Sequence, residues 1–157
     1  MARAAREAAA AHDGDPACVL AAGFSQGGMT ALAALLAEPE ALAGAAMLGG
    51  RLLPEVVPHV APPERLAGRA VLLVHGTGDP RVPLEEARRA RAHLSALPLV
   101  TTYAEVPARS HALTAAMRQQ LTAWTAGVVG VADRAARSAG GEGAAVGTVM
   151  GTTPGRA

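Results

Sequence analysis

Residues 17–38 read ACVLAAGFSQGGMTALAALLAE, and this stretch decides the fold. The apolar run over 17–23 predicts a short buried strand, and the apolar run over 29–38 predicts a buried helix. A strand that passes into a helix through a short glycine-rich turn is typical of proteins with a parallel sheet. We therefore expect an α/β fold with this segment near its centre.

The turn itself, GFSQGG at 23–28, fits the pattern Gly-x-Ser-x-Gly with Ser25 at its centre. A sharp turn from strand to helix forces the serine into a strained backbone conformation. Small residues at Gly23 and Gly27 let the two backbones pass closely. The hydroxyl then projects above the sheet, where the helix N-terminus favours negative charge. We expect a nucleophile elbow here; the alternative is a glycine-rich turn with an incidental serine.

The rest of the chain alternates further helices and strands. Helices are expected over 2–11, 84–97 and 110–128, strands over 42–50, 70–76 and 99–106, and a proline-rich loop over 51–68. The run AVLLVHG at 70–76 is continuously aliphatic and closed by glycine, as in a strand buried on both faces. Strands that alternate with helices predict a parallel sheet covered on both faces.

Composition narrows the function classes. The chain has 157 residues, half of them apolar, and a formal net charge of +1, so a nucleic-acid partner is not expected. Cys18 is the only cysteine, which excludes an intrachain disulfide and predicts a buried thiol. No apolar run approaches the about 20 residues of a membrane span, and acidic residues interrupt any N-terminal signal peptide. A cytoplasmic location is expected.

Two further motifs supply partners for Ser25. Asp79 follows the strand over 70–76 in the loop HGTGDPRVP, and His111 follows the strand over 99–106 in SHAL. Because the carboxyl ends of parallel strands meet at one edge of the sheet, both side chains should lie on the edge of Ser25. A nucleophilic serine needs a base, and the base needs an acid that orients it. The chain order Ser, Asp, His is that of an α/β-hydrolase.

Other candidates fit catalysis less well. His75 also ends a strand, but a structural role beside the acid loop is expected for it, and His59 lies in the proline-rich loop. The remaining candidates are expected to be solvated or at the opposite edge of the sheet: His12, His93, Asp13 and Asp15.

Together, GFSQGG, HGTGDPRVP and SHAL resemble the phospholipase/carboxylesterase family, which includes acyl-protein thioesterase-like enzymes. DPACVLAAGFSQGGMTAL resembles the elbow segment of that family, and LGGRLLP resembles the segment after its next strand. The resemblance runs from about Asp15 to about Val128. It implies a three-layer α/β-hydrolase-like sandwich, of which this chain carries the C-terminal part with about four parallel strands. Residues 1–129 would be this partial domain, and the Gly/Ala/Thr-rich tail at 130–157 is expected to be disordered.

The resemblance also implies roles for single residues. Ser25 would be the nucleophile, Asp79 the acid, His111 the base, and the backbone N–H of Gln26 one oxyanion donor. The implied activity is hydrolysis of small-molecule carboxylic esters or thioesters through an acyl-enzyme, with no cofactor and no metal. One departure is Ser110, where the family usually has glycine.

The larger departure lies upstream of the elbow. The family pattern implies a strand–helix half before residue 17, which normally supplies the second oxyanion N–H from a glycine-rich loop. Here only the helix over 2–11 is expected there, and no such loop precedes Ser25. The strand over 17–23 would then be an exposed apolar edge, open to self-association. Two alternatives to an active hydrolase follow: a truncated, non-catalytic fragment, or a half-enzyme completed by a partner chain at that edge.

Overall fold

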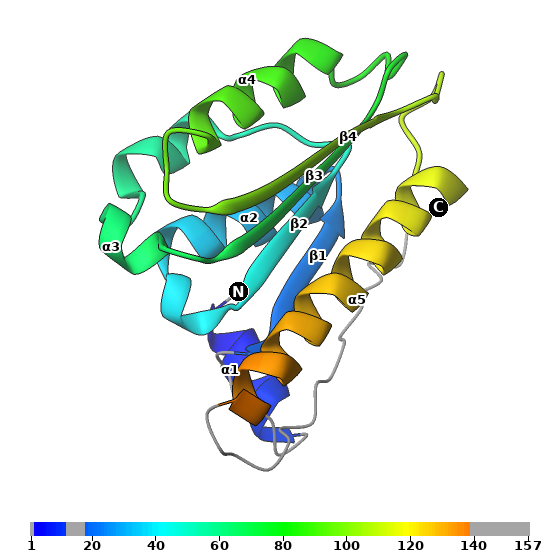
Figure 1. The fold of residues 1–157 in the computed structure, drawn as a ribbon. Helices are drawn as coiled ribbons and strands as arrows, with labels where there is room; N and C mark the ends of the chain where they lie inside the picture. Colours follow the sequence, from blue (N-terminus) through cyan, green and yellow to red (C-terminus); the bar gives the residue numbers. More distant parts are fainter. Residues whose placement is uncertain (1, 12–17, 139–157) are drawn as a thin grey trace.

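Four strands form one parallel sheet in the computed structural model, which describes residues 2–11 and 18–138 (Figure 1). The strands lie side by side in chain order, β1-β2-β3-β4. Their bounds are Leu20–Phe24 for β1, Gly44–Leu48 for β2, Ala70–Gly76 for β3 and Val100–Val106 for β4. The parallel α/β architecture predicted from the alternation of helices and strands is confirmed.

Helices cover both faces of this sheet (Figure 1). The α-helices are α1 (Ala2–Ala11), α2 (Gln26–Ala37), α3 (Pro63–Leu66), α4 (Leu84–Leu94) and α5 (Ala115–Ser138), with 3₁₀ helices η2 (Pro39–Ala41) and η3 (Pro54–His59). One core cluster joins α2, α3 and α4 to one face of the sheet, and a second joins α5 to the other. The sheet is therefore the middle of three layers.

The central strands explain how the two cores are separated. Successive side chains of a strand point to opposite faces. On β3, Val71 and Leu73 belong to the core under α2 and α4, whereas Leu72 and Val74 belong to the core under α5. All seven residues of β3 are buried, as its unbroken aliphatic run predicted.

The first residues of two helices differ from the sequence prediction. α2 begins at Gln26 rather than at residue 29, because the turn is completed within Ser25 and the helix includes both following glycines. α5 begins at Ala115, where the Thr114 hydroxyl accepts a hydrogen bond from the Met117 N–H.

α5 also continues to Ser138, past Gly130, where the helical pattern was expected to fail. An isolated glycine costs a helix only about 1 kcal/mol, and the following ADRAARS is rich in strong helix formers. The helix thus extends over 130–138, where the sequence pattern had led us to expect disorder. Residues 139–157 lie outside the described residues, so the rest of the predicted tail stays a prediction.

The proline-rich segment 51–68 is more ordered than the loop expected from its sequence. It contains η3 and α3, and each begins with a proline at its first helical position, where the missing N–H costs nothing. Leu66 of α3 is fully buried in the core under α2.

In the described part of the chain, no helix has both the length and the apolar character needed to cross a membrane.

Candidate active site

Ser25 joins β1 to α2 in a conformation that L-residues rarely adopt. Its φ is 53° and its ψ is −121°, and it is the only non-glycine residue with positive φ among the described residues. The Ser25 N–H donates to the carbonyl of Leu48 at 2.8 Å, and its own carbonyl accepts from the Met29 N–H at 3.0 Å. These bonds to β2 and α2 hold the serine in a backbone conformation that costs on the order of 1–3 kcal/mol.

Close packing of the turn depends on two glycines, and only one of them belongs to the Gly-x-Ser-x-Gly pattern. A Cβ on Gly23 would overlap the backbone of Gly27, and a Cβ on Gly28 would lie 2.5 Å from the Gly23 carbonyl oxygen. By contrast, a Cβ on Gly27 would meet nothing within 4 Å. The backbones pass closely, as expected, but the residue that must lack a side chain on the helix is Gly28 rather than Gly27.

Three side chains from distant parts of the sequence form one hydrogen-bonded row at the carboxyl ends of the strands. His111 Nε2 lies 2.8 Å from Ser25 Oγ, and His111 Nδ1 lies 2.7 Å from Asp79 Oδ2. An ionised carboxylate only accepts hydrogen bonds, so we assign the imidazole proton to Nδ1. Nε2 then presents a lone pair to the serine hydroxyl. The gathering of these three residues at one edge agrees with the sequence prediction.

Asp79 is held as an ionised acid. Its side chain is fully buried, and its second oxygen, Oδ1, accepts from the backbone N–H groups of Arg81 at 2.8 Å and Val82 at 3.0 Å. Burial by itself would raise the pKa of Asp79. The hydrogen bond from His111 and those two backbone donors outweigh burial and hold the pKa below its usual value. The carboxylate is therefore charged at neutral pH and accepts a hydrogen bond from the imidazole of His111.

The loop after β3, which carries Asp79, is hydrogen-bonded directly to the end of β4 and the loop that carries His111. The Thr77 N–H donates to the Val106 carbonyl at 3.0 Å, and the Gly78 N–H donates to the Ala108 carbonyl at 2.7 Å. A Cβ on Gly76 would lie 2.8 Å from the Cβ of Ala108. Because the loops meet backbone to backbone, the separation of Asp79 and His111 is set by main-chain contacts.

Phe24 is a site residue that the sequence reasoning missed. Its ring centroid lies 4.8 Å from that of His111, at an interplanar angle of 42°. A Cβ on Gly49, whose φ is +62°, would lie 2.7 Å from the same phenyl ring. Phe24 is thus wedged between the loop after β2 and the imidazole. The signal available in the sequence was the chain's single phenylalanine directly before Ser25.

The structure describes three of the other candidates. His75 is buried in β3, whereas His59 and His93 are exposed. His12, Asp13 and Asp15 lie outside the described residues. Gln26 is the first residue of α2, so its N–H has no acceptor within the helix and is free in that respect for an oxyanion. That role stays a prediction.

No metal centre is formed by residues 2–11 and 18–138, in which no three His, Cys, Asp or Glu side chains gather closely enough to hold an ion.

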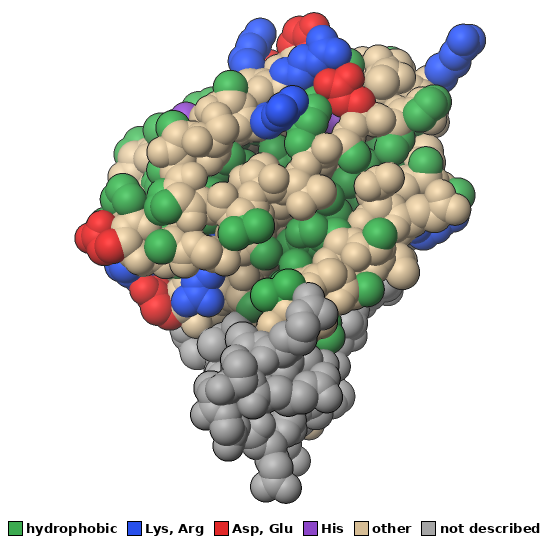
Figure 2. Space-filling model, in the orientation of Figure 1, with side chains coloured by type: hydrophobic (Ala, Val, Ile, Leu, Met, Phe, Trp, Pro, Cys, Tyr) green, Lys and Arg blue, Asp and Glu red, His purple; other side chains and the backbone are tan. Residues whose placement is uncertain are grey.

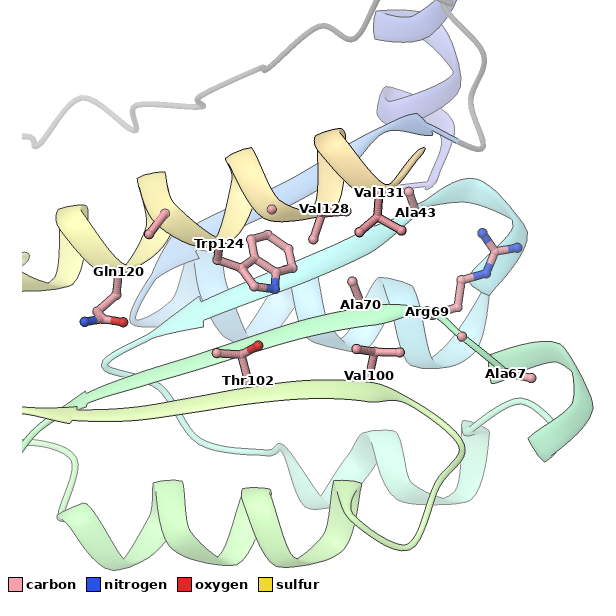
Figure 3. Close-up of a pocket in the computed structure, with 13 residues that line it drawn as sticks. Ala43, Ala67, Arg69, Ala70, Val100, Thr102, Gln120, Trp124, Val128 and Val131 are labelled. Carbon is pink, nitrogen blue, oxygen red and sulfur yellow. The ribbon is translucent and has the colours of Figure 1, made fainter. Parts of the chain in front are cut away.

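A cavity of about 700 Å³ lies between α5 and the first residues of β3 and β4 (Figure 3). Hydrophobic side chains are visible in the hollow between β4 and α5 (Figure 2). The residues that line the cavity include Arg69, Val100 and Trp124. The cavity lies at the opposite end of the strands from Ser25.

A parallel sheet between two helical layers, with a serine, a histidine and an aspartate at its carboxyl edge, defines the α/β-hydrolase class. Residues 14–127 match the family model described as Phospholipase/Carboxylesterase, so the chain belongs to that family. None of the curated protein sequences matches it significantly.

Several solved structures resemble the chain. SOBER1 of Arabidopsis thaliana is 25% identical, with a TM-score of 0.67 over 80% of this chain and 60% of its own. The Bacillus cereus carboxylesterase is 26% identical, with a TM-score of 0.64 over 79% of this chain and 56% of its own. Acyl-protein thioesterase 2 of Zea mays, at 22% identity and a TM-score of 0.57 over 68% of this chain and 54% of its own, shares the fold. The chain thus spans less than two thirds of the length of these relatives.

Proposed function

We propose that this chain is a serine hydrolase that cleaves carboxylic esters or thioesters through an acyl-enzyme. Ser25 is the nucleophile, His111 the general base and acid, and Asp79 the residue that orients the imidazole. The single observation that carries the proposal is the row Ser25–His111–Asp79, with both hydrogen bonds at 2.7–2.8 Å. Family membership supports the hydrolase class independently.

The atoms of this row suit acyl transfer. Ser25 Oγ attacks the acyl carbonyl carbon while His111 Nε2 takes the hydroxyl proton, and the carboxylate of Asp79 stabilises the imidazolium that forms. When the tetrahedral intermediate collapses, the bond to the alcohol or thiol breaks and Nε2 returns the proton to the leaving group. Water then attacks the acyl-serine with His111 again as base, which releases the carboxylic acid and restores Ser25.

The strained turn adds two features to this chemistry. The positive φ of Ser25 supports a nucleophile elbow, in which Oγ would project above the sheet. The first N–H groups of α2, including that of Gln26, offer donors and a positive dipole end to the developing oxyanion. No glycine-rich loop of the kind that donates a second oxyanion N–H precedes Ser25 in this sequence. Loss of one such donor typically lowers the rate about 10²–10³-fold, so slow turnover is expected of this chain alone.

A fluorophosphonate probe tests the proposal, because it phosphonylates only an activated serine. The folded protein should be labelled, whereas Ser25→Ala and heat-denatured protein should not. Ser95→Ala is the matched control, since Ser95 is an exposed residue after α4 whose hydroxyl bonds only to the Ala92 carbonyl in the described chain. Equal labelling of the parent protein and Ser25→Ala would contradict the assignment.

The two alternatives predict different outcomes of the same experiment. A non-catalytic fragment would leave the folded, monomeric protein unlabelled. A half-enzyme would be labelled only in an oligomeric fraction, because β1 is an edge strand of the described sheet and offers unpaired backbone groups to another chain. Size-exclusion chromatography before labelling separates these cases.

A further inference from the structure

His75 is a buried polar residue in an otherwise apolar strand. His75 is 1% exposed and lies in β3, two residues before the loop that carries Asp79 begins. Its Nε2 lies 2.8 Å from the carbonyl oxygen of Val82, while its Nδ1 is buried and has no hydrogen-bond partner among the described residues. A buried polar atom without a partner lowers the stability of the protein, so a histidine at this position calls for a functional reason.

These contacts assign the proton on the ring. A carbonyl oxygen only accepts, so Nε2 must carry the hydrogen and donate it to Val82. Nδ1 then holds a lone pair, and a second proton there would place a donor in a buried site without an acceptor. His75 is thus the neutral Nε2–H tautomer, with a fixed donor directed at one backbone group.

The bonded carbonyl belongs to the residue that anchors the acid. The Val82 N–H donates to Asp79 Oδ1 at 3.0 Å, and the other oxygen, Oδ2, accepts from His111. His75 thus holds Val82 by its carbonyl, Val82 holds Asp79 by its N–H, and Asp79 holds His111. The row of hydrogen bonds extends beyond the three proposed catalytic residues into the core of the sheet.

We propose that His75 is a positioning residue: through Val82 it fixes the position of the Asp79 carboxylate relative to His111. This inference rests on the proposed hydrolase function. His75 touches no reacting atom. Its bond stops the turn at residues 79–82 from relaxing, and a displacement of about 1 Å in such a row can cost about 10²-fold in rate. Removing the donor also leaves the Val82 carbonyl buried and unpaired, which favours that relaxation.

Three variants separate positioning from mere packing. His75→Leu fills the site without a donor, whereas His75→Gln places an amide N–H near the position of Nε2. We expect His75→Leu to lower kcat about 10–100-fold with little change in KM, and His75→Gln to recover most of it. His93→Leu, at an exposed position of α4, is the control and should match the parent.

Proton NMR of the resting protein gives a readout that needs no turnover. The hydrogen shared by His111 Nδ1 and Asp79 should give a far-downfield resonance in the parent and in His75→Gln, and a weakened or shifted one in His75→Leu. An unchanged resonance together with unchanged kcat in His75→Leu would overturn the inference. A parent protein that the fluorophosphonate probe does not label would instead refute the proposed function, while the resonance comparison still tests the positioning.

A measurement on the parent protein covers the case in which His75→Leu does not fold. Nitrogen-15 chemical shifts of the parent protein distinguish the two neutral tautomers and the imidazolium. We expect the Nε2–H tautomer for His75 at pH 7. An Nδ1–H tautomer has no hydrogen on Nε2 to donate to the Val82 carbonyl, and it would refute the inference without any variant.

Discussion

The two ends of the parallel sheet are built differently. At the carboxyl ends, backbones approach so closely that a Cβ could not be added at Gly23, Gly28 or Gly76 without displacing a neighbour. At the amino ends, α5 and β4 leave between them the cavity of about 700 Å³. Two side chains beside this cavity, Val100 and Val131, are 60% and 59% exposed.

The difference reflects what each end has to do. A hydrogen-bonded row such as Ser25–His111–Asp79 is directional, so it requires its loops at fixed separation, and close backbone packing provides that. Apolar contacts at the amino ends are not directional, so a gap between side chains there reduces only the apolar area that is buried. Close packing is not confined to the carboxyl edge, because a Cβ on Gly44, at the start of β2, would lie 2.6 Å from the Ala70 carbonyl oxygen. The polar residues are therefore what mark the proposed site.

The largest effect is expected at the carboxyl ends, from Asp79→Asn. Arg81 and Val82 donate to Oδ1, so the amide oxygen should keep that position and the amide nitrogen should face His111. Nδ1 must then accept, which places the proton on Nε2 and removes the base. We expect kcat/KM for a chromogenic ester to fall about 10⁴-fold.

Thermal unfolding is the control for Asp79→Asn, because the backbone bonds to the side-chain oxygen are retained. A variant that unfolds like the parent but loses less than about 10-fold in kcat/KM would show that the carboxylate does not set the tautomer of His111.

The second prediction compares the packed interior with the open amino end. Leu72 is fully buried under α5, and Leu72→Ala should lower the free energy of unfolding by about 2–5 kcal/mol because a cavity remains. Val100→Ala, at the exposed start of β4, should change it by no more than about 0.5 kcal/mol. Urea denaturation measures both. Equal losses would mean that the amino end is as closely packed as the interior.

The smallest effect comes from two neighbouring glycines of the turn. Gly28→Ala should destabilise the protein by about 1–3 kcal/mol, because its Cβ would lie 2.5 Å from the Gly23 carbonyl oxygen. Gly27→Ala has open space around it and should stabilise α2 by roughly 0.5–1 kcal/mol, since alanine is the better helix former. Differential scanning calorimetry would separate them. The opposite order would contradict the packing described for the turn.

Periodicity in the sequence was sufficient for the main elements. β3 begins and ends where its aliphatic run does, because a strand buried on both faces needs apolar residues at every position. It was less sufficient for helix ends. The start of α2 depends on the conformation of one residue, Ser25, and the length of α5 depends on how little Gly130 interrupts it.

The sequence by itself determined the class of protein and the edge of the sheet at which Ser25, Asp79 and His111 meet. Those conclusions follow from local patterns, since the carboxyl ends of parallel strands share one edge whatever the packing. Their catalytic roles stay predictions. Only the tertiary structure decided which glycine must lack a side chain, that Phe24 packs on His111, and that His75 reaches Asp79 through Val82. Each of these depends on distances between the atoms of segments that meet only after folding, and no local periodicity encodes them.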